Sequence, residues 1–375
     1  MSARATRPAQ AARPKIVDLS VLIMAGGTGG HVFPALAVAR ELERAGSRVV
    51  WLGTPESFES RLIPGTGIPF YEVPVRGLRG KGWLGWLMAP FVLLRALVLA
   101  LRALRQLSPD LVLGMGGYAT GPGGVAARLL GKPLVIHEQN AVPGLTNRLL
   151  ARIATRVLEA FPGSFPASRR ARHTGNPVRE EVTRLSPPDE RLAGRGGPLH
   201  LLVLGGSQGA KVLNEVVPDA IAGLADPDIV EVCHQTGAAN LEDTAARYRS
   251  AGIDARPVAF IEDMAEAYGW ADLVVCRAGA LTVSELAVAG VASVLVPFPH
   301  AVDDHQTKNG RHLADADAAL LIDQKQLDAA GLGALLVEFH GARERLLDMA
   351  MAARRLGIPT ATRQVSDCCL ELAHV

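Results

Sequence analysis

Two short glycine-rich segments of this chain have the residue types and spacing that could take part in chemistry. The first reads AGGTGGH at residues 25–31, and the second reads GGSQGA at residues 205–210. Each follows an apolar, strand-like run and precedes a helical pattern. A glycine turn between a strand and a helix lets backbone N–H groups approach an anion, which the positive helix end stabilises. The repeat therefore predicts two phosphate-handling halves.

His31 closes the first of these segments and is our first candidate for a general base. The positive end of the helix that it opens favours the neutral imidazole, which is the form that accepts a proton. The alternative is a histidine that only hydrogen-bonds the turn. Neither segment has the G-x-G-x-x-G spacing of a dinucleotide site or the Lys-Ser/Thr ending of a phosphate loop. A hydride-transfer enzyme, a kinase and an ATPase are therefore disfavoured.

Two further polar segments follow expected strands in the first half. Six glycines fall within residues 114–124, which is costly in chain entropy for a mere connector, so we predict a second anion site there, for a phosphorylated lipid. The candidate residues of this anion site are Gly116, Gly117 and Tyr118. The segment HEQN at residues 137–140 offers an acceptor, a donor and a possible base, and a structural polar turn is the alternative.

In the second half, the segment RAGALTVSE at residues 277–285 follows a strand-like run and enters a helix. Its small residues allow close backbone approach, Thr282 and Ser284 can donate to phosphate oxygens, and Glu285 can accept from a ribose diol. This pattern predicts a nucleotide site. A helix capped by Thr282 or Ser284 is the alternative, and both interpretations can hold together.

Strand and helix patterns alternate along the whole chain, which predicts an α/β protein with two doubly wound, Rossmann-like parallel sheets. A length of 375 residues exceeds what one core usually supports. We expect a disordered tail at 1–15, a first domain at 16–176, a linker at 177–197 and a second domain at 198–355. Strands are expected at 20–24, 49–52, 111–113 and 134–136, and then at 201–204, 230–233, 273–276 and 293–296. Ligands in such sheets bind beyond the carboxyl ends of the strands.

The composition restricts the possible partners and cofactors. The 39 basic and 37 acidic residues argue against a generic nucleic-acid binder, for which a strongly basic domain is expected. The four cysteines show no metal-ligand spacing, and residues 1–15 lack a signal-peptide core, so a reducing, cytoplasmic setting is expected. The D-x-D strings at 226–228 and 315–317 follow no expected strand end, so we predict surface turns and no metal.

The longest apolar stretch, at residues 83–104, indicates contact with a membrane surface. Arg95 and Arg102 interrupt it and Pro90 is expected to break a straight helix, so spanning is disfavoured. Arginines at 95, 102 and 105 share a helical face, which is typical of a segment that lies on a bilayer. A buried core helix with two solvent-facing arginines is the alternative. Nearby residues suited to headgroups or anionic lipid are Arg79, Lys81, Trp83, Trp86 and Phe91.

Seven segments, taken in order, resemble the motifs of the MurG family of bacterial peptidoglycan glycosyltransferases, in glycosyltransferase family 28. They are residues 26–31, 77–81, 114–124, 137–140, 175–179, 205–210 and 277–285. The resemblance extends from Val21 to about Ala361. One such segment alone is a weak signal, whereas the ordered set is highly specific.

The resemblance implies the GT-B architecture, in which two sheets face each other across a cleft and the last helix, at about 356–375, returns to the first domain. It implies an inverting enzyme that moves N-acetylglucosamine from its UDP donor to the 4-hydroxyl of undecaprenyl-diphosphate-linked N-acetylmuramoyl-pentapeptide. The expected location is the cytoplasmic face of the cell membrane, on an anionic surface and near other cell-wall synthesis proteins, with no cofactor and no nucleic acid.

The resemblance also implies roles for individual residues. His31 is the first candidate base and Glu138 the second; His305 is a rival to Gln306 as a donor contact. The implied contacts to the donor or the transferred sugar are Thr28, Gly29, Gly30, Asn140, Arg179, Ser207, Ile261, Ala280, Leu281, Thr282, Val283, Ser284, Glu285 and Gln306.

Two other classes of function stay open at this point. One is another lipid glycosyltransferase or a nucleotide-sugar epimerase of the same architecture, against which the segments at 77–81 and 114–124 argue. The other is a noncatalytic membrane protein that binds a UDP-sugar.

Overall fold

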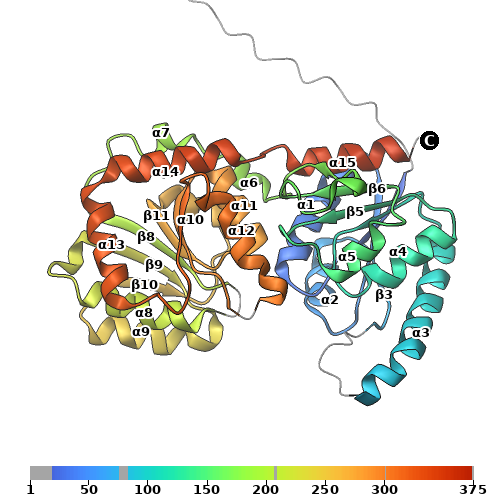
Figure 1. Ribbon diagram of the computed structural model, residues 1–375, viewed down its shortest axis with the longest axis horizontal. Coiled ribbons are helices and arrows are strands. Elements are labelled where there is room, and N and C mark those ends of the chain that lie inside the picture. Colours follow the sequence, from blue (N-terminus) through green and yellow to red (C-terminus); the bar gives the residue numbers. More distant parts are fainter. Residues whose placement is uncertain (1–18, 76–82, 207–208, 300, 374–375) are drawn as a thin grey trace, which may run out of the picture.

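The computed structural model describes residues 19–75, 83–206, 209–299 and 301–373, with the backbone alone for 83–89 and 302. The tail expected at 1–15 lies outside the described residues, as do Arg79, Lys81 and Ser207. The side chains of Trp83 and Trp86 are likewise not described. Figure 1 shows the chain as two α/β halves side by side, joined at their upper edge by the C-terminal helices.

The first half is built on a seven-stranded parallel sheet in the order β3-β2-β1-β4-β5-β6-β7. Its strands are β1 (Ser20–Met24), β2 (Arg48–Gly53), β3 (Phe70–Glu72), β4 (Leu111–Gly114), β5 (Leu134–Glu138), β6 (Arg156–Glu159) and β7 (Arg172–His173). Its helices are α1 (Gly29–Arg44), α2 (Phe58–Leu62), α3 (Trp83–Leu107), α4 (Thr120–Leu129) and α5 (Leu145–Leu150). Apolar residues of α1 pack on one face of the sheet, and those of α3, α4 and α5 pack on the other.

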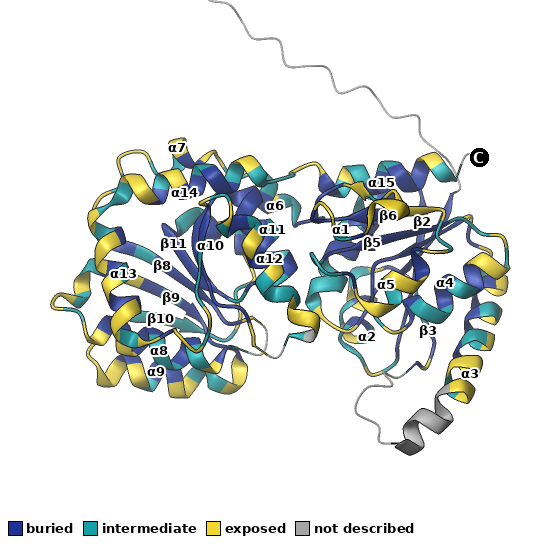
Figure 2. Cartoon of the chain, in the orientation of Figure 1, coloured by how far each residue is buried: buried dark blue, intermediate teal, exposed yellow. Residues whose placement is uncertain are grey.

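The second half repeats the design with six parallel strands in the order β10-β9-β8-β11-β12-β13. The strands are β8 (Leu199–Leu204), β9 (Val230–Gln235), β10 (Ala255–Val258), β11 (Leu273–Cys276), β12 (Ala292–Leu295) and β13 (Ala319–Leu321). The helices are α8 (Lys211–Ala222), α9 (Leu241–Ser250), α10 (Met264–Trp270), α11 (Ala280–Ala289), α12 (His305–Ala314), α13 (Ala329–Gly341) and α14 (Arg343–Leu356). In Figure 2 the central strands of both sheets are dark blue, because helices cover both of their faces.

The expected fold class is confirmed, since both sheets are parallel and doubly wound. All eight expected strands are present, with ends that differ by up to two residues. The expectation omitted five short strands, β3, β6, β7, β10 and β13, of which β6 lies next to a sheet edge and the other four are edge strands. Sequences such as Arg-His in β7 and Ala-Arg-Pro-Val in β10 lack a continuous apolar run, whereas β13 lies within the apolar run at residues 318–322.

Two segments connect the halves. Within residues 177–197 the chain forms the short helices α6 (Glu180–Thr183) and α7 (Pro188–Arg191), and Val182 is buried in a core cluster of the second half. The final helix, α15 (Ala361–Leu372), lies back against α1 and contributes Val365, Cys368 and Cys369 to the first core (Figure 1). The chain therefore crosses between the halves twice.

Helix α3 is continuous through Pro90, so the expectation that this proline breaks the helix is wrong. Pro90 lies in the second helical turn, where its missing N–H removes one backbone hydrogen bond. The buried side of α3 carries small residues, Ala96, Ala100 and Ala103, whereas Phe91 is 68% exposed. Within the described residues, no helix is both long enough and apolar enough to cross a bilayer.

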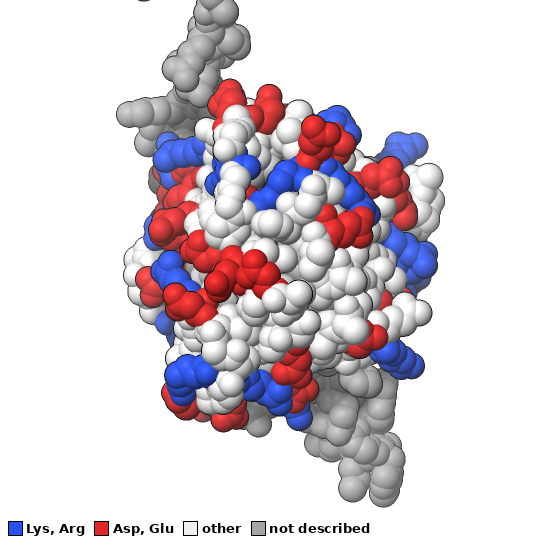
Figure 3. Space-filling model, turned by 90° about the vertical axis from the view of Figure 1, so that its left-hand side faces the viewer, with Lys and Arg blue, Asp and Glu red and all other residues white. Residues whose placement is uncertain are grey.

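Surface charge agrees with the near-neutral composition. On the face of the second half that Figure 3 shows, basic and acidic side chains are interspersed over the surface. This face therefore presents no large field of one sign.

Candidate active site

His31 lies in the first turn of α1, directly beyond the carboxyl end of β1. Its Nδ1 is 2.8 Å from Oε1 of Gln139, which follows β5, so the ends of two parallel strands meet at this imidazole. Thr28 is the N-cap of α1, is exposed, and makes no capping hydrogen bond through its side chain. Its hydroxyl is therefore available to a ligand beside His31.

The glycines after β4 complete the surroundings of this histidine. Gly116 has a φ of +98°, and a Cβ added there would come within 2.8 Å of the His31 Nδ1. Gly117 has a φ of +93°, and its Cβ would come within 2.7 Å of the backbone of Gly26. Close packing of the two glycine turns thus accounts for these two residues, while Tyr118 beside them is 56% exposed. The anion site predicted at residues 114–124 stays a prediction.

Glu138, the second candidate base, is buried, and its carboxylate already accepts hydrogen bonds from several donors. Its carboxylate accepts hydrogen bonds from the backbone N–H groups of Asn140 and Gly144, at 3.0 and 3.1 Å. It also accepts from the side-chain amides of Asn140 and Asn147, at 3.1 and 2.9 Å. Four donors on two oxygens leave little capacity for a substrate proton, so the structure favours the polar-turn interpretation for this residue.

We expect Glu138→Gln to act on stability more than on chemistry. The new amide group would face N–H donors in a buried site, which costs about 2 kcal/mol or more. The melting temperature should fall by several degrees, while the folded protein keeps turnover within about tenfold of the parent. Glu159→Gln is the control, since that buried carboxylate organises the turn after β6 through only two backbone N–H groups. A loss of turnover of at least 100-fold with an unchanged melting temperature would contradict this expectation.

Asn140 and Asn309 join the two halves across the cleft. Asn309, fully buried in α12, donates from Nδ2 to Oδ1 of Asn140 at 3.2 Å and accepts from the backbone N–H of Ala141 at 2.8 Å. Its Nδ2 also lies 3.3 Å from the carbonyl oxygen of Ala278, just before α11. Asn309 therefore ties the turn after β5 to the turn that opens the expected nucleotide site.

Helix α11 begins at Ala280 with Gly279 as its N-cap and without a side-chain cap, so the capped-helix alternative is wrong. Ser284 donates to the carbonyl of Ala280 one turn back. Val283 is fully buried in the core, while Leu281 and Thr282 are partly exposed. The helix N-terminus is thus available to an anion, and Val283 contributes packing.

Glu285 and Arg179 form an ion pair between the second half and the connecting segment. Arg179 Nη1 is 2.5 Å from Glu285 Oε1, and the hydroxyl of Tyr268 donates to the other carboxylate oxygen at 3.1 Å. The Arg179 guanidinium also lies over the ring of Phe33 in α1, 4.8 Å from its centroid. Burial raises the pKa of Glu285, and Arg179 opposes that rise. Each carboxylate oxygen has one of these partners and can accept a further hydrogen bond, but Glu285 is buried, so its burial limits access by a ribose.

A pocket of about 600 Å³ opens at the carboxyl ends of the second sheet. Gln306 lines it, accepting from the backbone N–H of Phe298 through Oε1, so its NH₂ can donate elsewhere. Lys211 and Arg277 bring positive charge to the same pocket. Its volume suits a nucleotide sugar. His305 is not among the lining residues, which supports Gln306 in the choice between the two.

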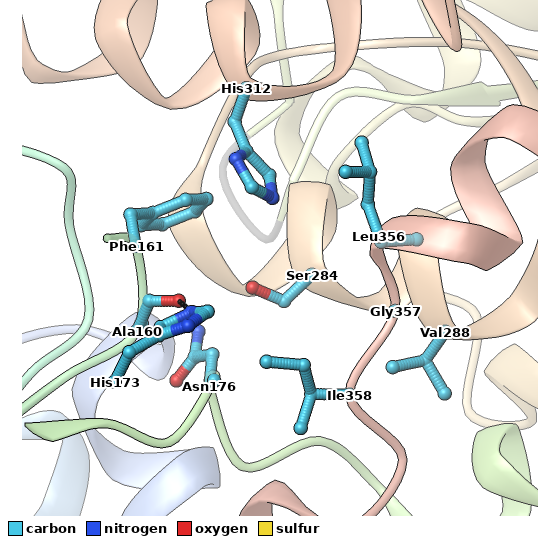
Figure 4. Close-up of a pocket in the computed structure, with 12 residues that line it drawn as sticks. Ala160, Phe161, His173, Asn176, Ser284, Val288, His312, Leu356, Gly357 and Ile358 are labelled. Atoms are coloured by element: carbon cyan, nitrogen blue, oxygen red, sulfur yellow. Dashed lines mark hydrogen bonds between the residues drawn. The ribbon is translucent and has the colours of Figure 1, made fainter. Parts of the chain in front are cut away.

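A second cavity, of about 20 Å³, lies at the junction of the halves and is too small for such a ligand. Figure 4 shows side chains from both halves around it, including Phe161, Asn176, Ser284 and His312. Ser284 therefore lies on the wall of this cavity. Ile261, the expected uracil contact, is partly buried against the neighbouring core.

Some site residues were beyond sequence reasoning. Gln139 was one letter of a polar turn, and neither Asn309 nor Lys211 belonged to a segment that the sequence analysis singled out. The only local signal was the position of Gln139 at a strand's carboxyl end. Among the described residues, no group of three or more His, Cys, Asp or Glu side chains is arranged to hold a metal ion.

Comparison with known proteins adds independent evidence. Residues 21–159 match the glycosyltransferase family 28 N-terminal domain, and residues 200–365 match its C-terminal domain. The chain is 58% identical to a UDP-N-acetylglucosamine–N-acetylmuramyl-(pentapeptide) pyrophosphoryl-undecaprenol N-acetylglucosamine transferase of Pseudomonas fluorescens, over 95% of this chain and 99% of that one. A protein of the same name from Marinobacter nauticus is 56% identical, over 94% and 97% of the two chains. The crystal structure of Acinetobacter baumannii MurG aligns with a TM-score of 0.82 and 45% identity, over 94% of this chain and 99% of that chain.

Proposed function

The chain belongs to glycosyltransferase family 28, and on that premise we propose that it transfers N-acetylglucosamine from UDP-N-acetylglucosamine to undecaprenyl-diphosphate-linked N-acetylmuramoyl-pentapeptide. The observation that carries the proposal is full-length identity of 55–58% to several enzymes named for this reaction. The two-sheet GT-B fold supports the proposal, since the pocket of about 600 Å³ and His31 lie at strand ends of different halves.

The chemistry is a direct displacement with inversion at the anomeric carbon. The 4-hydroxyl of the muramoyl sugar attacks that carbon, its proton passes to His31 Nε2, and the bond to the UDP oxygen breaks with its electron pair. A positioned general base of this kind contributes about 10²–10⁴-fold to a rate. The occupied carboxylate of Glu138 supports His31 as the base.

The departing UDP needs positive charge near its diphosphate. The N-termini of α8 and α11 and the side chains of Lys211 and Arg277 supply it in this proposal. Ser207, Thr282 and Arg179 are assigned to the donor by the family resemblance. Thr28, Gly29, Gly30 and Asn140 would line the cleft around the transferred sugar. This charge is provided by the chain itself, and we propose that no metal is required.

The acceptor is a lipid, and we propose that α3 brings the protein onto the anionic membrane that contains it. The exposed side of α3 carries Phe91, Leu93, Leu94 and Val98 together with Arg95, as the yellow outer face of α3 in Figure 2 indicates. An amphipathic helix usually exposes polar residues and buries large apolar ones. Helix α3 instead exposes large apolar residues and buries alanines, and such an exposed apolar face marks an interaction surface. Since the donor is a water-soluble nucleotide sugar, we assign the enzyme to the cytoplasmic membrane face, near other cell-wall enzymes.

Phe91→Asp combined with Leu94→Asp should abolish most membrane binding. Burial of each large apolar side chain contributes about 1.5–3 kcal/mol, so the affinity for phosphatidylglycerol vesicles should fall at least tenfold in co-sedimentation. Val337→Asp is the matched control, because Val337 is 51% exposed on α13 in the other half. Equal binding by the double variant and the parent would remove α3 from the proposal.

The transfer itself is tested with purified protein, radiolabelled UDP-N-acetylglucosamine and the lipid-linked muramoyl acceptor. Label should move to the lipid, and UDP should be released in equal amount. Conversion of the donor to an epimer, without any acceptor, would favour the epimerase alternative. Donor binding without turnover would favour the noncatalytic alternative.

A further inference from the structure

A chain of three side chains connects the proposed base to a backbone carbonyl that lies deeper in the first half. It runs from His31 Nδ1 to Gln139 Oε1 at 2.8 Å, then from Gln139 Nε2 to His137 Nδ1 at 3.2 Å. It ends at the carbonyl oxygen of Gly175, 3.0 Å from His137 Nε2. His137 and Gln139 are buried, and the function proposed above assigns no task to either of them.

The backbone carbonyl sets the direction of every hydrogen bond in this chain. A carbonyl oxygen can only accept, so His137 Nε2 must carry a proton and donate it to Gly175. Complete burial lowers the pKa of His137 to about 4, so the ring is neutral and its Nδ1 holds a lone pair. That lone pair requires a donor, and among the described residues the NH₂ group of Gln139 is the one at hydrogen-bond distance.

The amide of Gln139 is thereby oriented with its oxygen toward His31. The reverse orientation would need protons on both nitrogens of His137, that is, a buried imidazolium beside an amide oxygen. His31 Nδ1 must then be the donor to Gln139 Oε1, and neutral His31 carries its lone pair on Nε2. Within the described part of the chain, Nε2 has no hydrogen-bond partner.

We propose that Gln139 is a positioning residue that holds His31 in the Nδ1–H tautomer, so that Nε2 faces the acceptor hydroxyl as the base. This inference rests on the function proposed above and adds a residue to it. Once Nε2 takes the proton, the amide oxygen of Gln139 continues to accept from Nδ1–H of the imidazolium. Gly116 lies so near the imidazole that a Cβ added there would come within 2.8 Å of Nδ1, and this limited space around the ring acts in the same direction.

The decisive variant is Gln139→Met, which keeps the length of the side chain and removes both polar groups. Without an acceptor at Nδ1, a share of His31 shifts to the Nε2–H tautomer, which cannot act as the base. In serine proteases the wrong histidine tautomer costs about 10⁴-fold. For a partial shift we expect kcat to fall about 10²-fold, with KM for both substrates within threefold of the parent. Gln139→Glu keeps an acceptor at this position and should retain more turnover than Gln139→Met.

The tautomer is read directly by ¹⁵N NMR of histidine-labelled protein, with the His31 signals identified by their loss in His31→Asn. The parent protein should show Nδ1–H, Gln139→Met should show Nε2–H in part or whole, and Gln139→Glu should show Nδ1–H. An Nε2–H tautomer in the parent overturns the proposal, and that measurement needs no Gln139 variant to fold. Loss of turnover in Gln139→Met with His31 still in the Nδ1–H form also overturns it. If the parent transfers no sugar, the proposed function fails, whereas the tautomer result stands separately.

Discussion

His31→Ala should reduce kcat by about 10²–10⁴-fold while leaving KM for the donor nearly unchanged. The imidazole lies at the acceptor-side strand ends, bound through Nδ1 to Gln139, and the proposed donor pocket is lined by residues of the second half. Its removal therefore withdraws the proton acceptor but not the contacts that bind UDP. Steady-state transfer assays with the lipid acceptor, at saturating donor, measure this effect.

His340→Ala is the control for loss of a partly exposed histidine, because His340 lies in the last turn of α13, away from the cleft. Its turnover should equal that of the parent. The melting temperature of His31→Ala should stay within a few degrees of the parent, since the side chain is only partly buried. Full turnover in His31→Ala would mean that another group acts as the base.

The central strands of both sheets are predictable because helices cover them on both faces. Strand β11 consists of Leu, Val, Val and Cys, all fully buried, and it begins and ends where the apolar run does. Strand β7 has only Arg172 and His173, both exposed at a sheet edge. Nothing in such a pair distinguishes a strand from a loop, since backbone pairing with β6 alone defines it.

The turns that carry the site residues could be predicted from the sequence, but the contacts between those residues could not. Parallel topology places the turns after β1, β4 and β5 at the carboxyl end of one sheet, and the sequence analysis assigned His31 and residues 137–140 to such turns without predicting the distances between them. The partner of His31 is 108 residues away, and Asn309 reaches Asn140 over 169 residues. Those pairs depend on strand register and on how the two halves meet, which no local pattern encodes. The family resemblance supplied candidate contacts and left the Arg179 to Glu285 pair unforeseen.

Gly116→Ala should lower kcat by about 10²-fold, because the added methyl group would displace the imidazole of His31. Its φ of +98° is costly for alanine, by about 1–2 kcal/mol, and the added Cβ would lie 2.8 Å from His31 Nδ1 and 2.9 Å from Cε1. The imidazole must move by several tenths of an ångström or rotate away from Gln139. A misplacement of about 1 Å near reacting groups can cost 10²-fold.

Gly67→Ala separates the two effects, because Gly67 has a similar φ of +82° and nothing lies within 4 Å of its added Cβ. This control should lose stability to a similar extent and keep its turnover. Equal turnover in Gly116→Ala and Gly67→Ala, at equal melting temperature, would mean that the imidazole tolerates displacement. A selective loss in Gly116→Ala would instead show that the glycine after β4 serves the reaction by holding the base, because alanine at that position adds volume against the imidazole without removing any polar group.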